Sequence, residues 1–290
     1  MDSMPAAPLA ALVCPVCRSP FGAGSGGRSL VCPAGHSFDA ARQGYFNFLT
    51  GKGTVFEADT ADMVAARFDF LSAGHYRELA EAVAELAAPL LTFDDAAVLD
   101  AGTGTGHYLR AVLDRVPAAA VGVDISKFAL RRAARLNPEA VNLVADVWQP
   151  LPLADGSVDV VTVVFAPRNA AEFARVIRPG GRLIVVTPRP GHLAEIAGQT
   201  GMLGIEPAKE ERLAASLAGH FVACEVRELD LMLALAPADV ASLALMGPAG
   251  HHLDREALAA RVTGLPSRSA VSARFRISVF EPRPVGAGSA

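Results

Sequence analysis

The chain has 290 residues, of which 51% are hydrophobic and 19% are charged. A chain this apolar can bury enough surface to offset the entropy cost of ordering, which excludes an intrinsically disordered protein. The formal net charge of -4 excludes a globally basic nucleic-acid binder, so any contact with nucleic acid has to come from local patches. No uncharged apolar run reaches the roughly 18 residues of a membrane helix, and residues 1–13 lack the basic start of a signal peptide. We therefore expect a cytoplasmic protein without membrane contact.

The N-terminal segment carries a pattern typical of a metal site. Cys14 and Cys17 form a C-x2-C pair, and after a gap of 14 residues Cys32 and His36 form C-x3-H. Three thiolates and one imidazole are ligands of a structural, tetrahedral zinc ion, which leaves no open position for catalysis. Residues 1–50 are rich in Gly, Ser, Pro and Cys, so they cannot form a stable hydrophobic core without a cross-link such as a bound metal ion. The alternative is a set of reduced thiols without a metal.

Helical periodicity follows the cysteine-rich segment. Two helices are expected at 61–71 and 76–91, separated near Gly74. We interpret residues 51–92 as a helical linker between a zinc-binding domain, residues 1–50, and a larger domain, residues 93–290.

Short apolar strands and helices alternate from residue 96 onward. Strands are expected at 96–101, 119–123, 141–145, 158–165 and 183–186, helices at 107–115, 127–136 and 170–177, and a turn at 179–181. Continuous apolar strands at this spacing favour an α/β fold, a parallel sheet with helices on both faces. The last third predicts helices at 206–218 and 238–245, and strands at 222–229 and 274–280, one of which is antiparallel to the rest.

A glycine-rich turn connects the first of these strands to its helix. Gly102, Gly104 and Gly106 alternate along it, so the backbone can turn sharply and approach a ligand closely. A dinucleotide-binding fingerprint requires glycine or alanine where this chain has His107, and no Gly-Lys-Ser/Thr follows for a phosphate loop. The spacing therefore disfavours a nicotinamide cofactor.

Three acidic residues end three successive strands, at the edge where doubly wound folds bind ligands. They are Asp100, Asp124 and Asp146. A carboxylate at the second position can accept both ribose hydroxyls of a nucleoside, and one at the third can accept the exocyclic amine of adenine. Helix capping is the alternative for Asp124, because Ser126 and Lys127 begin a helix there.

These motifs, with Pro179-Gly180-Gly181 before the fifth strand, resemble the class I S-adenosylmethionine-dependent methyltransferases. The resemblance covers about residues 95–280 and implies a Rossmann-like sheet of seven strands, helices on both faces and an antiparallel seventh strand. It also implies that Asp100 and the glycine turn hold the methionine end of the cofactor, Asp124 the ribose and Asp146 the adenine. The cofactor-binding set implied in this way is Asp100, Gly102, Thr103, Gly104, Thr105, Gly106, His107, Tyr108, Asp124, Ile125, Asp146 and Val147.

The order of motifs along nearly the whole chain resembles one family, the 23S ribosomal RNA guanine-N1-methyltransferases. The motifs are the zinc knuckle, Gly44-Tyr45-Phe46-Asn47, Ala73-Gly74-His75-Tyr76, the methyltransferase turn and Phe165-Ala166-Pro167. The resemblance implies methylation of a guanine in hairpin 35 of 23S rRNA, and it is compatible with a homodimer that binds RNA between its subunits. Arg168-Asn169 look more like the branch that confers resistance to tylosin-like or mycinamicin-like macrolides.

The loop after the fourth strand lies beside the methyl group in this fold. It supplies the candidates for the target base, which are Phe165, Pro167, Arg168 and Asn169. Guanine N1 carries a proton at neutral pH, so the site has to help remove it or stabilise the negative charge that spreads to O6. Arg168 is the candidate for O6 and Asn169 for the Watson–Crick edge, unless both only cap the next helix. The loop contains no evident base.

A row of cations lies on the helix expected at 127–136. Lys127, Arg131 and Arg135 are spaced to share one face, with Arg132 beside them. A solvated helix face is the favoured interpretation over RNA contact.

Two other functions remain open on the sequence alone. A small-molecule methyltransferase with a purely structural zinc module is favoured slightly by the acidic charge balance. A non-enzymatic RNA-binding or assembly factor is the third hypothesis, against which the intact glycine turn and its three carboxylates argue.

Overall fold

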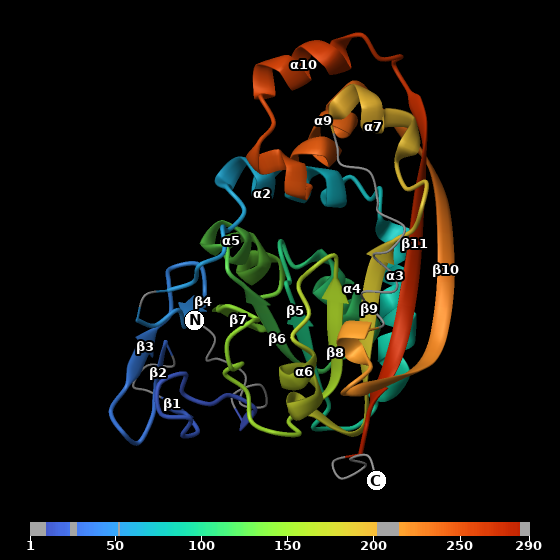
Figure 1. Cartoon of the computed structure of the whole chain (residues 1–290). Helices are drawn as coiled ribbons and strands as arrows, with labels where there is room; N and C mark the ends of the chain where they lie inside the picture. Colours follow the sequence, from blue (N-terminus) through green and yellow to red (C-terminus); the bar gives the residue numbers. More distant parts are fainter. Residues whose placement is uncertain (1–9, 24–27, 52, 202–214, 285–290) are drawn as a thin grey trace.

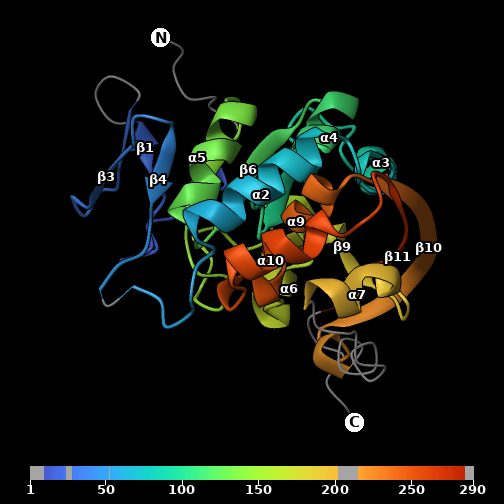
Figure 2. The same ribbon diagram turned by 90° about the horizontal axis from the view of Figure 1, so that it is seen from above.

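The computed structural model of the chain describes residues 10–23, 28–51, 53–201 and 215–284. Its centre is a mixed eight-stranded sheet of order β10-β11-β9-β8-β5-β6-β7-β4 (Figure 1). A three-stranded antiparallel sheet, β1-β2-β3, lies at the N-terminal side beside the edge strand β4. Viewed from above, this small sheet and β10 lie at opposite ends of the molecule (Figure 2).

The seven strands of the methyltransferase half form the expected class I sheet. Five are parallel, namely β5 (Ala97–Ala101), β6 (Ala119–Asp124), β7 (Val141–Val144), β8 (Val158–Val164) and β9 (Ile177–Pro188). The last strand, β11 (Ser269–Pro282), is antiparallel to both β9 and β10 (Phe221–Leu235). The expected fold class and the antiparallel final strand are therefore confirmed.

Helices cover both faces of the sheet, as continuous apolar strands require. They include α3 (Arg77–Ala87), extended by the 3-10 turn η2 (Ala88–Leu90), α4 (His107–Arg115), α5 (Lys127–Leu136) and α6 (Ala170–Val176). In the strands, Val98 packs in a core with Leu79 of α3 and Leu109 of α4, whereas its neighbour Leu99 packs in a second core with Phe173 of α6. Because successive side chains of a strand point to opposite faces of the sheet, neighbouring residues contribute to two separate cores.

The N-terminal ribbon shares the second of these cores. Its strands are β1 (Gly22–Ala23), β2 (Ser29–Val31) and β3 (Ser37–Asp39). The next strand, β4 (Tyr45–Asn47), leaves the ribbon and pairs in parallel with β7. Leu12 and Phe46 are buried against strands of the central sheet. The expected number of seven central strands is therefore corrected to eight within the described residues, because the cysteine-rich segment supplies one.

A layer of helices lies beyond the carboxyl ends of the parallel strands (Figure 1). It consists of α2 (Ala61–Ser72), α7 (Ala194–Thr200), α9 (Pro237–Leu245), η3 (Pro248–His251) and α10 (Arg255–Thr263). Helix α9 contacts both α2 and α10. None of the helices in the described ranges is long and apolar enough to cross a membrane.

Several elements differ from the sequence expectation. The expected turn at 179–181 lies inside β9, where the pairing with β8 shifts register. Strands β10 and β11 are longer than expected because they pair along nearly their whole length. Helix α10 was not expected, and it buries only Leu258 and Val262, which leaves little periodic signal. The expected helix at 206–218 lies mostly outside the described residues.

Phe173 tests the core between α6 and the sheet. Its side chain is fully buried, so Phe173→Ala is expected to lower the free energy of unfolding by about 3–5 kcal/mol. Urea denaturation followed by circular dichroism measures this change. Phe93 is 68% exposed, and the control Phe93→Ala should cost less than about 0.5 kcal/mol. Equal losses in the two variants would contradict this description of the core.

Candidate cofactor and target-base site

Three carboxylates gather at the carboxyl ends of neighbouring strands. Asp100 lies in β5, Asp124 ends β6, and Asp146 follows β7. Because these strands are adjacent and parallel, their ends meet at one edge of the sheet. Asp100 and Asp146 are buried. A buried carboxylate needs hydrogen-bond or charge partners, so this edge is suited to a polar or cationic ligand.

Asp100 keeps unused bonding capacity. Its Oδ1 accepts a 2.7 Å hydrogen bond from the Thr162 hydroxyl, whereas its Oδ2 and the buried Thr103 hydroxyl have no partner in the described part of the chain. Burial, and to a lesser degree the charge of Asp124, raise the pKa of Asp100 to about 6. A cationic amino group would offset both effects. The residues therefore fit the methionine end of S-adenosylmethionine.

The glycine turn between β5 and α4 makes contacts that leave no room for side chains. Gly102, Gly104 and Gly106 have φ values of 82°, 54° and 85°. A Cβ at Gly102 would lie 2.2 Å from the Cβ of Ala166, so the turn packs directly against the loop after β8. A Cβ at Gly106 would lie 2.5 Å from the Asn137 amide nitrogen, which donates to the Gly106 carbonyl. The missing side chain of Gly102 thus allows the close approach of the loop after β8, and that of Gly106 allows α4 to pack against the end of α5.

The other two carboxylates hold local backbone and keep acceptor capacity. Asp124 accepts hydrogen bonds from the Ser126 N–H at 2.8 Å and from an N–H of the glycine turn at 2.9 Å, and burial raises its pKa. Asp146 accepts from the Trp148 N–H at 2.9 Å and from the Thr54 hydroxyl at 2.8 Å. A carboxylate offers about four lone-pair sites. Both side chains can therefore still accept from the hydroxyl or amine groups of a nucleoside.

The remaining residues of the predicted cofactor set lie along the same edge. Thr105 is buried, and its hydroxyl lies 2.9 Å from Nδ1 of His107, whose pKa burial lowers to about 4. Burial also raises the pKa of Tyr108. Ile125 is half-buried beside Asp124, and Val147 is buried beside Asp146. The fold therefore gathers the whole predicted set around the ends of β5, β6 and β7.

The segment at 53–60 lies against the ends of β6 and β7, where it contacts Asp146 and Ser126. The carbonyl of Asp59 accepts a 2.8 Å hydrogen bond from the Ser126 hydroxyl. The ring of Phe56 lies over the indole of Trp148, with centroids 6.3 Å apart. This segment therefore ties the connection between ribbon and α2 to the strand ends.

Arg67 of α2 joins this segment to the helical layer. Its guanidinium forms an ion pair with Asp59 and donates a 2.6 Å hydrogen bond to the carbonyl of Met246 at the end of α9. A Cβ at Gly104 would lie 3.6 Å from the Arg67 Cδ. Arg67 consequently lies close to the glycine turn at Gly104.

The loop after β8 presents one exposed ring, that of Phe165, beside the glycine turn. Phe165 has a φ of 55°, an uncommon and costly conformation for a bulky residue, and it is 45% exposed. The centroid of its ring lies 5.8 Å from that of the buried Phe275 in β11. The Phe275 ring in turn contacts the rings of Tyr76 and His192, with centroid distances of 5.0 and 4.9 Å. A flat base can stack on an exposed ring such as that of Phe165.

The three other target-base candidates have different surroundings. Pro167 is exposed, and Arg168 is half-buried without a carboxylate partner among the described residues. Burial lowers the pKa of Arg168 below its ordinary value. The Asn169 amide donates a 2.9 Å hydrogen bond to the Val147 carbonyl, and its oxygen accepts from the Glu172 N–H at 3.4 Å. Asn169 thus caps α6, the role that the sequence left open for it.

The four predicted zinc ligands come together in the ribbon. The ligand atoms of Cys14, Cys17, Cys32 and His36 all lie within 4.8 Å of one another. The sulfurs of Cys17 and Cys32 are 3.6 Å apart, and His36 Nδ1 lies 3.3 Å from the Cys32 sulfur. A tetrahedral zinc ion with bonds of about 2.3 Å places its sulfurs about 3.8 Å apart. The donor set therefore fits a structural zinc ion.

Arg18 connects the zinc knuckle to the methyltransferase half. Its φ is 61°, and its guanidinium donates hydrogen bonds to the carbonyls of Leu151 and Leu153 at 2.6 and 3.1 Å. Arg175 of α6 donates to the same carbonyls at 3.1 and 2.8 Å. The loop at 147–153, which follows Asp146, is therefore held by the knuckle and by α6 together.

Four residues of the site were not among the sequence candidates. They are Thr54, Arg67, Tyr76 and His192, and each comes from a segment far from the glycine turn in sequence. The Tyr76 hydroxyl is buried without a partner in the described ranges. His192 Nδ1 accepts the Arg274 N–H at 3.0 Å, and burial lowers its pKa to about 4, so the ring is neutral at neutral pH. Of the four, Tyr76 lies in the Ala73-Gly74-His75-Tyr76 motif that carries the family resemblance, although the motif alone does not indicate contact with the crevice.

Asp100 gives the ligand-free protein a pH-dependent stability. Its pKa is raised from 3.8 to about 6 in the folded state, so the folded state binds the proton more tightly than the unfolded state. The free energy of unfolding should therefore fall, by up to about 3 kcal/mol, as the pH rises from about 4 to 6, and then level off. Asp100→Asn should remove this decrease in urea titrations. The exposed Asp94, changed to Asn, is the control, and an unchanged slope in Asp100→Asn would contradict the assignment.

Comparison with known proteins identifies both halves of the chain. A methyltransferase-domain family matches residues 98–181, and the N-terminal zinc ribbon of RlmA matches residues 12–51. A 23S rRNA (guanine(748)-N(1))-methyltransferase of Streptomyces fradiae is 44% identical over 276 residues, which cover 94% of this chain and 97% of the relative. A Micromonospora griseorubida protein provisionally named 23S rRNA (guanine-N(1)-)-methyltransferase is 45% identical over 288 residues, or 93% and 97% of the two chains. With identity of this level along both halves, the chain belongs to the 23S rRNA guanine-N1-methyltransferase family, whose methyl donor is S-adenosylmethionine.

Proposed function

We propose that this protein transfers a methyl group from S-adenosylmethionine to N1 of a guanine in hairpin 35 of 23S rRNA, in the cytoplasm. One observation carries the proposal. The loop after β8 packs so closely on the glycine turn that Gly102 and Ala166 leave no room for another side chain. This contact supports a position beside the methionine end of the crevice for the exposed Phe165 and for Arg168, which has no carboxylate partner among the described residues. An RNA base and a methyl donor can meet there.

The cofactor assignments follow from the geometry of the strand ends. We assign Asp100 and the glycine turn to the methionine end, Asp124 to the ribose and Asp146 to the adenine. We assign the half-buried Ile125 and the buried Val147 as the apolar neighbours of the cofactor's adenine ring. When bound, S-adenosylmethionine supplies an electrophilic methyl group.

The chain's own residues then orient the guanine and stabilise its charge. Phe165 offers its exposed ring face to the base, which has to be unstacked from the RNA to reach it. The S–CH3 bond of the donor would break, leaving its electron pair on sulfur, as the new N–C bond forms. The N1 proton leaves to solvent, because the loop contains no evident base, and negative charge spreads to O6 before or during that step. The Arg168 guanidinium, which has no carboxylate partner among the described residues, is available to stabilise that charge. Asn169 holds the loop in place through α6.

The zinc ribbon is assigned a structural role in this scheme. Cys14, Cys17, Cys32 and His36 hold the ion with no position open for chemistry. We keep the division into a ribbon at 1–50, a linker at 51–92 and a methyltransferase domain at 93–290, with β4 joining the first to the last. We also propose that the protein forms a homodimer that binds RNA between its subunits. We further propose that it confers resistance to tylosin-type or mycinamicin-type macrolides. The likeness to the Streptomyces fradiae enzyme supports the resistance role.

Methyl transfer to RNA is the direct test of this function. Labelled methyl from S-adenosylmethionine should enter unmodified 23S rRNA, and reverse transcription should stop at a single guanine in hairpin 35, because N1-methylguanine cannot pair. The position equivalent to guanine 748 is the first to examine. Asp124→Ala should abolish incorporation by removing the ribose acceptor. Intact cofactor binding without incorporation into this RNA would overturn the proposal and turn attention to small-molecule acceptors.

The hydrogen bonds of Arg18 to the loop after β7 predict that the zinc knuckle supports cofactor binding even without RNA. Arg18→Ala should weaken S-adenosylmethionine binding about tenfold, since a charged donor bonded to two carbonyls contributes about 1.5–3 kcal/mol per bond and Arg175 retains part of the hold. Calorimetric titration measures the affinity, and metal analysis should show an unchanged zinc content. Arg28→Ala is the matched control, because Arg28 bonds only within the ribbon. An unchanged affinity in Arg18→Ala would show that α6 alone positions the loop.

A further inference from the structure

Helix α5 is the most basic element near the crevice. It carries four cations and no acidic residue, in a chain with a net charge of -4. The four are Lys127, Arg131, Arg132 and Arg135, and none has a carboxylate partner within the described ranges. The neighbouring helix α4 differs, because its Arg110 is ion-paired with Asp114 and Glu139. Unpaired cations concentrated on one helix of an acidic protein favour a polyanionic partner.

Aromatic rings hold these cations in place of carboxylates. The Lys127 ammonium lies 5.6 Å and the Arg131 guanidinium 5.3 Å from the centroid of Phe128. The Arg132 guanidinium lies 4.6 Å from the ring of Phe68 in α2. Stacking of this kind orders a cation without neutralising it, so its N–H groups stay available for phosphate oxygens.

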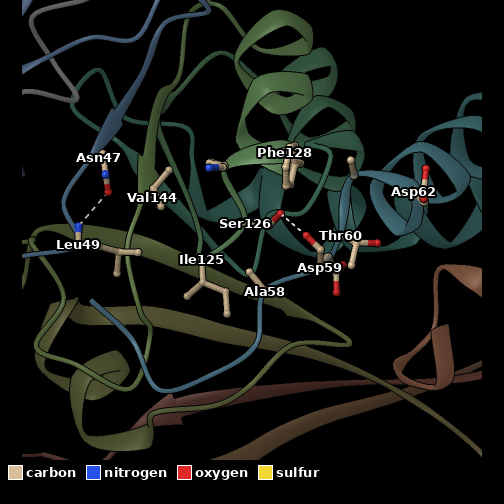
Figure 3. A pocket seen from close by; sticks show the side chains of 12 residues that line it. Asn47, Leu49, Ala58, Asp59, Thr60, Asp62, Ile125, Ser126, Phe128 and Val144 are labelled. Carbon is tan, nitrogen blue, oxygen red and sulfur yellow. Dashed lines mark hydrogen bonds between the residues drawn. The ribbon is translucent and has the colours of Figure 1, made fainter. Parts of the chain in front are cut away.

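A cavity of about 540 Å³ opens beside the N-terminal end of this helix (Figure 3). Leu49, Ile125, Phe128 and Val144 supply apolar walls, and Lys127 also lines it. Cavities of roughly 300–1,000 Å³ are typical of small-ligand sites, and flat apolar walls are suited to the faces of a nucleobase. Lys127 therefore belongs both to the cavity wall and to the row of cations on α5.

The acidic residues of the cavity are already neutralised. Asp59 is paired with Arg67, and Asp62 is paired with Arg255 at 2.6 Å. Ser126, which also lines the cavity, donates its hydroxyl to the Asp59 carbonyl. The described residues of the glycine turn do not line it. The cavity is thus distinct from the methionine end of the crevice, and it borders the nucleoside end at Ile125, which forms one wall of it.

We propose that this cavity receives an unstacked base of the RNA substrate other than the target guanine, while α5 binds the phosphates on either side of it. This inference rests on the proposed function, since it requires an RNA substrate. A second bound base fixes the register of the hairpin, so that one guanine among its neighbours reaches Phe165. The site therefore contributes to the choice of guanine as well as to affinity.

The salt dependence of RNA binding tests the phosphate contacts. Lys127→Ala and Arg131→Ala should each weaken RNA binding several-fold and lower the slope of log affinity against log salt by about 0.7–0.9. Arg115→Ala is the matched control, because Arg115 is an exposed cation at the far end of α4. It should change neither quantity. S-adenosylmethionine affinity, measured by calorimetry, should stay unchanged in all three variants.

Photocrosslinking tests the base pocket directly. Phe128 replaced by p-benzoylphenylalanine should crosslink to one nucleotide that differs from the methylated guanine. The same replacement of Phe93, which is exposed near the start of β5, should give no crosslink to RNA. The position of the crosslinked nucleotide, mapped by reverse transcription, identifies the second base.

The outcomes separate this site from the function on which it rests. Failure of methyl transfer to any RNA overturns the proposed function. Normal methyl transfer with unchanged RNA affinity and salt slope in the α5 variants overturns only the docking site. Loss of S-adenosylmethionine binding in Lys127→Ala would overturn it by assigning the cavity to the cofactor. A crosslink from position 128 only to a second copy of the chain would overturn it by assigning the surface to a subunit interface.

Discussion

The contact between the glycine turn and the loop after β8 is the constraint on which the site depends. Gly102 has no Cβ, and Ala166 has nothing beyond one, so the two backbones approach more closely than other residues allow. This approach brings Phe165 to the end of the crevice and holds it at a positive φ. The strain there persists because α6, capped by Asn169, and the Phe275 ring hold the loop from both sides.

The ribbon and the methyltransferase half form one packed unit. Leu12 and Phe46 are buried in the core that contains Leu99 and Phe173, and Arg18 shares two carbonyl acceptors with Arg175. The zinc ion therefore does more than fold a small module. By ordering the knuckle, it determines where Arg18 lies and hence how firmly the loop after β7 is held. A metal site without an open ligand position can in this way support chemistry at a distance.

The sequence predicted those parts whose signals are local. The bounds of α4 and α5 were anticipated because the glycine turn and the Ser126 cap mark their starts, and the five parallel strands because they are short apolar runs. The three carboxylates could be placed together since each ends a strand. By contrast, Thr54, Arg67 and His192 reach the crevice only through tertiary folding. Strand β4 has three residues, too few for a periodic signal, and the capping bonds of Asn169 could not be distinguished from base contact without the fold.

The parallel pairing of β4 with β7 also protects the sheet against unwanted association. An exposed strand edge offers unpaired N–H and C=O groups to any other extended chain. At the far edge, β10 carries Glu225, Glu228 and Asp230, charges that oppose strand addition. At the near edge, β7 is short and entirely buried, and it has no such charges. The edge of β7 is instead covered by β4, which pairs with it and is anchored to the ribbon. Loss of zinc would loosen the ribbon that anchors β4 and would therefore expose an apolar strand edge to association with other chains.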